Sequence, residues 1–343
     1  MNLLYAQGGA IEGGPIGSSD VLDGVYVPTH VPLKKSMKYE VVREADYIWG
    51  KRVYRKIDLR EKMNYPLKYP LDFVGANIPE PNDLWIRNSN RWSLWTIIRY
   101  LVMEGKVTVY HHANPSNADY KNGDQFIYPI KSKFDQDAYF YDEAYRKELF
   151  RYLGALGDYK INEETGEVLS QTDDNGDPLL DQYGIPIPLP RDTTWLEGGD
   201  ILGYELKEDW FFDKERSVLD VRIIGIAPIV NFADEYLSKP VTFNEVKNDW
   251  NAKIVMEAPL FWLYFPELRE YLANYYVYNE DNDAQWMSFD DFFWKRRFSS
   301  YILKESNVFD RQVESYRYGI DALIESEAIT EEIRTLEHDM WNF

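Results

Sequence analysis

Residues 200–230 read DILGYELKEDWFFDKERSVLDVRIIGIAPIV, a pattern that predicts two β-strands joined by a short connection. The first strand is expected over residues 201–207. The second is expected from Ser217 onward, where apolar and charged residues alternate with the period of two typical of a half-buried strand. From residue 223 the alternation gives way to an almost wholly apolar run, typical of a strand covered on both faces. Pro228 is expected to end this strand, because proline cannot donate to a central ladder. We therefore expect this hairpin to form the centre of the sheet.

The connection between the two strands concentrates acidic and aromatic residues. It holds the carboxylates Glu208, Asp209, Asp213 and Glu215, with the aromatics Trp210, Phe211 and Phe212 among them. A glycosidase needs two carboxylates that flank the bond to be cleaved, and aromatic rings can stack on a sugar. Here all four carboxylates lie in one short connection beside basic residues, which favours a solvated turn held by salt bridges. A carbohydrate-binding or carbohydrate-cleaving protein that uses the 208–215 carboxylates is the alternative function.

Three segments of the chain resemble one protein family. They are YELKEDWFFDKERSVLDVRIIGI at residues 204–226, VYRKIDLREKMNYP at 53–66 and SLWTIIRYLVMEGKVTVY at 93–110. The first resembles the signature segment of the GldN/PorN family, gliding-motility and type IX secretion proteins of the Bacteroidetes. The other two agree with that family in order and rough position, so the resemblance extends over about residues 37–310.

The resemblance implies a structural role without catalysis. Proteins of the GldN/PorN family pair with a GldK/PorK-type lipoprotein in a periplasmic ring under the outer membrane. That ring meets the periplasmic part of the GldM/PorM shaft, which crosses the inner membrane together with GldL/PorL. By resemblance, the chain is expected to be a non-enzymatic ring subunit in the periplasm, associated with the outer membrane through its lipoprotein partner and self-associating through the complex.

The charge balance limits the partners. A formal net charge of −20 disfavours nucleic acid, whose binding depends on neutralising phosphates with Lys and Arg. The same charge disfavours anionic lipid surfaces. The sequence therefore points to a basic protein surface as the macromolecular partner.

Cysteine and hydropathy exclude further classes. The chain has no cysteine, which excludes disulfides, thiolate catalysis, a cysteine zinc site and a lipid anchor on the chain itself. No apolar run approaches the roughly 18 residues of a membrane span. The opening residues MNLLYAQ resemble the tail of a signal peptide, which agrees with the export that the family implies.

Aromatic residues are unusually dense, at 16% with 27 Tyr and 11 Trp. Tyr and Trp bury a large area while keeping a polar atom, so they suit protein interfaces. An aromatic-rich core explains the same composition. Both interpretations are open from the sequence.

Two segments invite a metal interpretation that their spacing opposes. DDNGDPLLD at residues 173–181 places oxygen ligands like the start of a calcium loop. However, Pro178 stands where the loop needs glycine, and the closing Glu is missing. His111 and His112 are neighbours on an expected strand, so they point to opposite faces. The glycine-rich GGAIEGGPIG matches no phosphate-binding loop, and no G-x-S-x-G elbow occurs. We therefore expect no catalytic, cofactor-binding or metal-binding residues and no cofactor.

The chain divides into three expected regions around an α+β fold. Residues 1–36 are expected to form a flexible tail and an extended arm, and residues 37–265 an α+β core with a mostly antiparallel sheet and packed helices. Turn signals such as Asn175-Gly176 predict a β-hairpin insertion at residues 158–193. Residues 266–343 are expected to form a helical C-terminal region.

Periodicity assigns the remaining elements. Apolar residues at 41, 45, 48, 49, 53 and 57 predict a helix, and so does the stretch 94–102, capped by Asn90 or Ser93 and stopped by Gly105. Strands are expected at residues 106–112 and at 253–264, with a break at Pro259. Further helices are expected at residues 142–153, 268–275, 289–302 and 318–341, the last with a helix start at Thr330.

Two interface hypotheses follow from these patterns. The aromatic segment 289–298 or the arm at residues 21–32 is expected to insert into a neighbouring subunit. Replacing Trp294 and Phe298 by alanine is then expected to weaken assembly without unfolding. The hairpins at 158–193 are expected to be peripheral and dispensable for folding.

Overall fold

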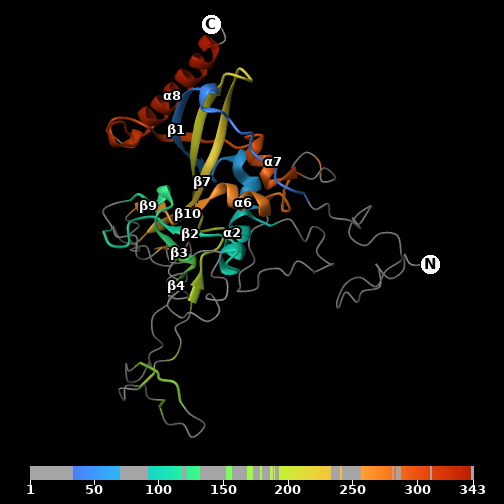
Figure 1. Cartoon of the computed structure of the whole chain (residues 1–343). Helices are drawn as coiled ribbons and strands as arrows, with labels where there is room; N and C mark the ends of the chain where they lie inside the picture. The colour runs from blue at the N-terminus through green and yellow to red at the C-terminus, as the bar shows by residue number, and fades with distance from the viewer. Residues whose placement is uncertain are drawn as a thin grey trace, which may run out of the picture.

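The structure is a computed structural model. It describes residues 34–69, 92–117, 121–131, 152–156, ten positions between 168 and 189 (168–172, 178–179, 186–187 and 189), 193–232, 240–241, 256–279, 282, 287–309 and 311–340. Over these residues it shows the expected α+β fold with a mostly antiparallel sheet (Figure 1). The arm at residues 21–32 lies outside the described residues, and so does nearly all of the helix expected at 142–153.

A nine-stranded sheet forms the body of the protein, with the order β13-β1-β6-β7-β10-β2-β3 and with β8 and β9 also paired to β7. Each pairing is antiparallel. The strands are β1 (Tyr47–Asp58), β2 (Val109–His111), β3 (Pro129–Lys131), β6 (Gly203–Asp213), β7 (Val218–Phe232), β8 (Pro240–Val241), β9 (Met256–Pro259), β10 (Phe261–Tyr264) and β13 (Tyr301–Glu305). The β6–β7 hairpin lies at the centre, which confirms its predicted role.

The hairpin is longer than predicted, and its turn is shorter. Strand β6 continues to Asp213, so the turn comprises only residues 214–217, with Ser217 in the left-handed region at φ 53°. The aromatic run at 210–212 suits a strand, and a register shift at Lys207/Glu208 lets the pairing with β7 continue to Val218. The prediction that 208–213 belongs to a solvated turn is therefore wrong.

Pro228 does not end β7, contrary to the prediction. It pairs with Tyr204 of β6, and β7 continues to Phe232. The carbonyl of Pro228 accepts a hydrogen bond from the Leu260 amide (2.7 Å) at the junction of β9 and β10. The ladder on that side is already interrupted between these two strands, so a proline is tolerated there.

Strand β1 replaces the predicted helix at residues 41–57. It pairs with β6 along its whole length and with β13 over four residues. Val41, expected on the buried stripe, is 93% exposed, whereas Val53 and Ile57 are fully buried. The aromatic and β-branched residues of β1 favour a strand, and two neighbouring strands satisfy its backbone.

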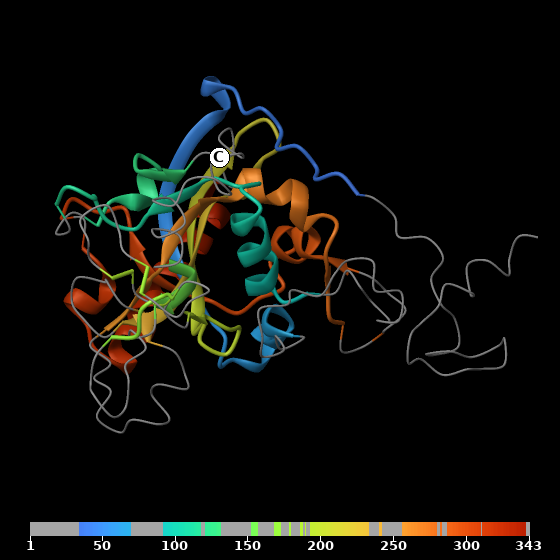
Figure 2. The same cartoon turned by 90° about the horizontal axis from the view of Figure 1, so that it is seen from below.

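The helices pack beside the lower part of the sheet and along its upper end (Figures 1 and 2). They are α1 (Tyr65–Lys68), α2 (Leu94–Met103), α6 (Phe265–Leu272), α7 (Phe289–Trp294) and α8 (Ile320–Met340), with 3-10 turns η1 (Glu44–Asp46), η2 (Lys62–Asn64), η3 (Gly123–Gln125) and η5 (Val313–Ser315). The prediction of α2 is confirmed: the Thr96 amide donates to Ser93 Oγ at its start, and Gly105 adopts φ 63° after its end.

Two C-terminal predictions are corrected. The helix expected over 289–302 ends at Trp294, because Arg296 adopts φ 50° and the chain then enters β13. Thr330 lies inside α8 and donates to the Ser326 carbonyl (2.9 Å), so no helix starts there. Strand β13 therefore joins the main sheet from within the region expected to be helical.

Two hydrophobic cores share one face of β1. The larger core includes Ile57 and the buried faces of α2, α6 and α7. The smaller core, beneath α8, comprises Val53, Ile302, Val313, Ile329 and Ile333. Between Val53 and Ile57 on the same face lies Arg55, which donates to Ser300 Oγ and to its carbonyl (both 2.9 Å). A polar layer thus separates the two cores.

Two small sheets complete the described fold. Strands β11 (Tyr276–Val277) and β12 (Met287–Ser288) pair beside α7. Strands β4 (Gly154–Leu156) and β5 (Thr193–Trp195) pair at the two ends of the predicted insertion. Of the insertion itself, the structure describes only scattered positions, among them a bridge between Thr172 and Pro178.

Candidate functional site

The start of the described chain lies as a strap over α6, α7 and β7. The Lys34 amide donates to Asn274 (3.0 Å), and Arg222 of β7 donates to the Glu40 carbonyl. Tyr39 stacks on Trp294 of α7, with ring centroids 5.5 Å apart. These contacts fix residues 34–40 across α6, α7 and the part of β7 that lies nearest the hairpin turn.

A cavity of about 370 Å³ lies under this strap. Apolar and aromatic side chains and charged groups both line it: Tyr39, Ile223, Phe265, Phe293, Trp294, Glu40, Arg216, Asp220, Arg269, Asp290 and Arg296 are among them. These charged groups already have partners. Arg216 contacts Glu40 and Asp220, and Arg296 binds Glu208 outside the lining. Arg269 donates twice to Asp290 (2.6 and 3.1 Å), and both side chains are at least nine-tenths buried. The cavity is therefore a self-neutralised pocket in which carboxylates and guanidinium groups hold one another.

The polar layer between the two cores centres on Glu208. Its side chain is fully buried and accepts two hydrogen bonds from Arg296 (2.8 and 3.2 Å) and one from Trp210 Nε1 (2.9 Å). Burial lowers the pKa of neighbouring Arg55. The negative charge of Glu208 opposes this shift by raising the pKa. Glu208 is thus a structural carboxylate held between cations and an indole.

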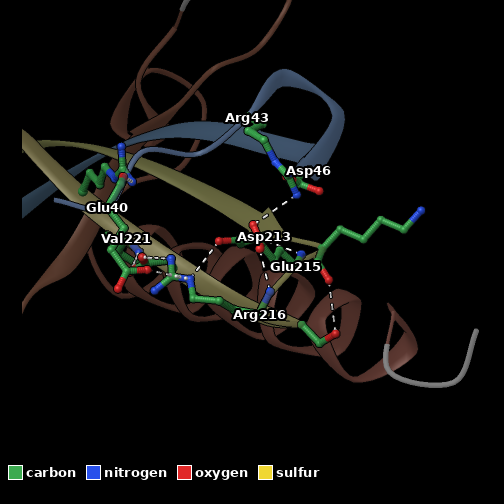
Figure 3. A network of polar contacts seen from close by, with 11 residues as sticks. Glu40, Arg43, Asp46, Asp213, Glu215, Arg216 and Val221 are labelled. Atoms are coloured by element: carbon green, nitrogen blue, oxygen red, sulfur yellow. Dashed lines mark hydrogen bonds and ion pairs between the residues drawn. The ribbon is translucent and has the colours of Figure 1, made fainter.

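A second polar network lies at the tip of the hairpin, beside η1 (Figure 3). Arg216 bridges Asp213 (2.8 Å) and Asp220 (2.7 Å), and Arg43 bridges Asp46 (2.6 Å) and Glu215 (3.2 Å). The hydrogen bonds to Asp213 and Asp220 raise the pKa of Arg216, and the hydrogen bond from Arg216 lowers the pKa of Asp213. This network ties η1 to the β6–β7 turn.

Each of the four carboxylates predicted as a possible sugar site has an arginine partner. Their partners are Arg296 for Glu208, Arg52 for Asp209, Arg216 for Asp213 and Arg43 for Glu215. This confirms the salt-bridged interpretation, although Glu208 is buried rather than solvated. Carboxylates that are each held by an arginine do not present the facing acid and nucleophile of a glycosidase.

The face of the sheet opposite to Val53, Arg55 and Ile57 carries a row of polar side chains. Tyr54 donates to Asp124 (2.5 Å), and Lys207 contacts the same carboxylate (3.2 Å). Glu205, next to Lys207 on this face, is buried, and burial raises its pKa to about 7. The charge of Asp124 raises it as well, while Lys304 and Lys56 lower it. The charge of Glu205 is therefore expected to change near neutral pH.

The metal interpretations of the sequence find no support among the described residues. The Nδ1 atom of His111 lies 2.8 Å from Tyr152 Oη. Burial lowers the pKa of His112 to about 4. Within the part of the chain that the structure describes, no group of three His, Asp or Glu side chains is arranged to hold a metal. The calcium-like segment 173–181 lies outside the described residues except for Pro178 and Leu179.

The aromatic segment 289–298 faces inward. Phe289, Phe292, Phe293 and Phe298 are buried in the larger core, whereas Trp294 is 46% exposed. The prediction that both Trp294 and Phe298 are free to insert into a neighbour is therefore wrong for Phe298. Aromatic density in this segment serves the core.

Residues 42–342 match the family model described as gliding motility associated protein GldN. The chain belongs to the GldN family. This confirms the resemblance carried by the three sequence segments, and it makes the protein a gliding-motility-associated component of a family with no known enzymatic role. The comparison with curated proteins found no match. In the described part of this GldN-family protein, no helix is both long and apolar enough to cross a membrane.

Sequence reasoning missed the exposed apolar residues at the C-terminal end. In the structure Val308, Phe309, Tyr318, Ile320, Leu323 and Ile324 are exposed. The sequence predicted a helix over residues 318–341 without separating a buried face from an exposed one. Leu323 and Ile324 lie three and four residues after Ile320, and Glu327 lies three residues after Ile324, all on the outer face. The signal was present in this spacing.

Proposed function

We propose that this protein is a structural, non-enzymatic subunit of the type IX secretion and gliding machinery. It forms a periplasmic ring with a GldK/PorK-type lipoprotein, which holds it at the outer membrane, and it contacts the GldM/PorM-type shaft. The observation that carries the proposal is the GldN family match over residues 42–342.

The arrangement of the described residues suits a part that keeps its shape under load. Strand β6 pairs with β1 on one side and with β7 on the other along all eleven of its residues. Ion pairs reinforce this unit: Arg43 and Arg216 hold its tip, and Arg52 of β1 pairs with Asp209 of β6. A continuous antiparallel ladder resists shear along its strands because many hydrogen bonds are loaded together.

Co-expression with the GldK/PorK-type lipoprotein from the same genome tests the proposal. The complex is analysed by size-exclusion chromatography with light scattering, and each protein alone serves as the control. We expect co-elution in a defined assembly containing several copies of both. Separate elution of two well-folded proteins would contradict the proposal, and a screen for sugar binding would then be the next step.

A further inference from the structure

Helix α8 presents two different faces. Ser326, Ile329 and Ile333 are buried and pack toward β13 and the smaller core. Ile320, Leu323 and Ile324, spaced three and four residues apart, lie on the other face and are 76, 48 and 58% exposed. Exposed apolar side chains gathered on one helical face are typical of a docking surface.

A groove of about 330 Å³ opens beside the first turns of α8. Its lining is mostly apolar and comes from β13, η5 and α8: Tyr301, Ile302, Leu303, Val313, Glu314, Gly319, Ile320, Ala322 and Leu323. Gly319 adopts φ 58° at its edge, a conformation that favours glycine. The groove and the exposed face of α8 share Ile320 and Leu323, so they form one surface.

The loop before η5 displays two further apolar side chains. Asn307 holds this loop by donating to the carbonyls of Glu305 and Arg311 (both 2.9 Å) and by accepting from the amides of Phe309 and Arg311 (3.0 and 3.2 Å). Val308 and Phe309 are nevertheless 96 and 74% exposed. A loop organised in this way presents its apolar side chains at little conformational cost on binding.

Charge identifies the kind of occupant. Helix α8 carries seven acidic residues and one arginine, and Glu327 and Glu331 continue the outer face beyond Ile324. A second copy of this chain, with a net charge of −20, is repelled by such a face. A segment with apolar side chains flanked by Lys or Arg complements it.

We propose that the groove and the outer face of α8 bind an amphipathic basic segment of a partner protein. Its apolar side chains cover Ile320, Leu323 and Ile324, and its Lys or Arg side chains face Glu327 and Glu331. The chemistry of this surface stands on the structure, whereas its assignment to the lipoprotein of the ring rests on the proposed function.

The first experiment uses the full chain and a synthetic probe. The probe is a fluorescent amphipathic peptide of about five helical turns, with Leu on one face and Lys on its flanks, and binding is followed by fluorescence polarisation. The double variant Ile320→Asn/Ile324→Asn is expected to weaken binding by about tenfold or more, because two apolar side chains lose their burial. Glu327→Lys is expected to weaken it by a few-fold.

Matched controls separate this surface from general attraction to an acidic protein. Val41→Asn removes an exposed apolar side chain that does not line the groove, and Glu44→Lys changes the net charge as Glu327→Lys does. A peptide of the same composition with its Leu residues scattered replaces the probe. No binding of the probe, or equal effects of the α8 variants and their controls, would overturn the proposal.

The second experiment repeats the lipoprotein co-elution with the α8 variants. Loss of co-elution with Ile320→Asn/Ile324→Asn, but not with Val41→Asn, supports the assignment to the ring. If the lipoprotein does not bind the wild-type chain while the peptide does, the proposed function fails and the surface stands. If light scattering shows a dimer of the wild-type chain that the double variant abolishes, the occupant is a second copy and the proposal is wrong.

Discussion

The guanidinium of Arg296 donates two hydrogen bonds to the carboxylate of Glu208, whose side chain has no contact with solvent. Arg296 lies two residues after the end of α7 and adopts φ 50°. The pair lies between the two hydrophobic cores, and Trp210 Nε1 adds a third hydrogen bond. Arg296 thus adopts a left-handed backbone conformation and also neutralises the buried charge of Glu208.

Arg296→Ala is expected to lower the free energy of unfolding by about 3 kcal/mol, because it leaves the Glu208 carboxylate buried without its main cation. Arg296→Gly removes the same guanidinium but accepts the left-handed backbone, so it should be about 1 kcal/mol more stable than Arg296→Ala. Urea titration of both variants measures the difference. Equal midpoints would show that the backbone at residue 296 is not strained.

Trp294→Ala and Phe298→Ala should behave differently. Phe298→Ala is expected to destabilise the protein by about 3 kcal/mol, because it opens a cavity in the larger core. Trp294→Ala should change the melting temperature little but should free Tyr39 and the strap. Trypsin should then cleave faster after Lys34, Lys35 and Lys38, as followed by mass spectrometry. Tyr65→Ala, at an exposed aromatic residue elsewhere, should leave these cleavage rates unchanged.

The pH dependence of stability should contain two opposed contributions. The pKa of Glu205 is raised from 4.5 to about 7, so the folded state holds a proton that the unfolded state loses, and this contribution falls as the pH rises through that range. The pKa of His112 is lowered from 6.5 to about 4, so its contribution rises with pH over that range. Between 4.5 and 6.5 the two effects oppose each other.

Single variants should separate these contributions in thermal melts across the same range of pH. In Glu205→Gln the stability should rise with pH, and at about pH 8 this variant should exceed the wild type by at most about 3 kcal/mol. In His112→Gln the stability should fall as the pH rises toward 7. Parallel curves for the wild type and both variants would contradict both pKa shifts.

Replacing residues 157–192 by Asn-Gly should preserve the fold. Leu156 and Thr193 are paired across β4 and β5, and a two-residue Asn-Gly turn suits such a pair. The shortened chain should keep a cooperative thermal transition within a few degrees of the wild type. Loss of that transition would show that the insertion supports the core.

The sequence predicted the hairpin, α2 and the break at Pro259 because each has a local signal. The error at β1 has a definite cause. Apolar residues at 41, 45, 49, 53 and 57 are four apart, a spacing that fits a helical turn and also keeps every residue on one face of a strand. What decides between them is the partner strands β6 and β13, which a local pattern does not contain.

The candidate sites show the same limit. The four carboxylates near 208–215 were recognised, and salt bridges were expected. Yet Arg52 lies 157 residues from Asp209, Arg43 lies 172 from Glu215, and Arg296 lies 88 from Glu208. Only the fold brings these partners together. The outer face of α8 was different, since the spacing of Ile320, Leu323 and Ile324 is readable in the sequence, although no exposed face was predicted from it.

Strand β1 is synthesised well before either of its neighbours: the partner of Arg52 in β6, Asp209, follows it by 157 residues, and β13 follows later still. The contact of Arg55 with Ser300 joins residues 245 apart, so β13 leaves the ribosome long after β1. At about 5–20 residues per second, this delay is roughly 12–50 s. Throughout it, one edge of β1 has no strand to pair with, and an open edge is a template for aggregation. The nascent chain therefore depends on its last strand, and on whatever shields β1 until then, to finish the sheet.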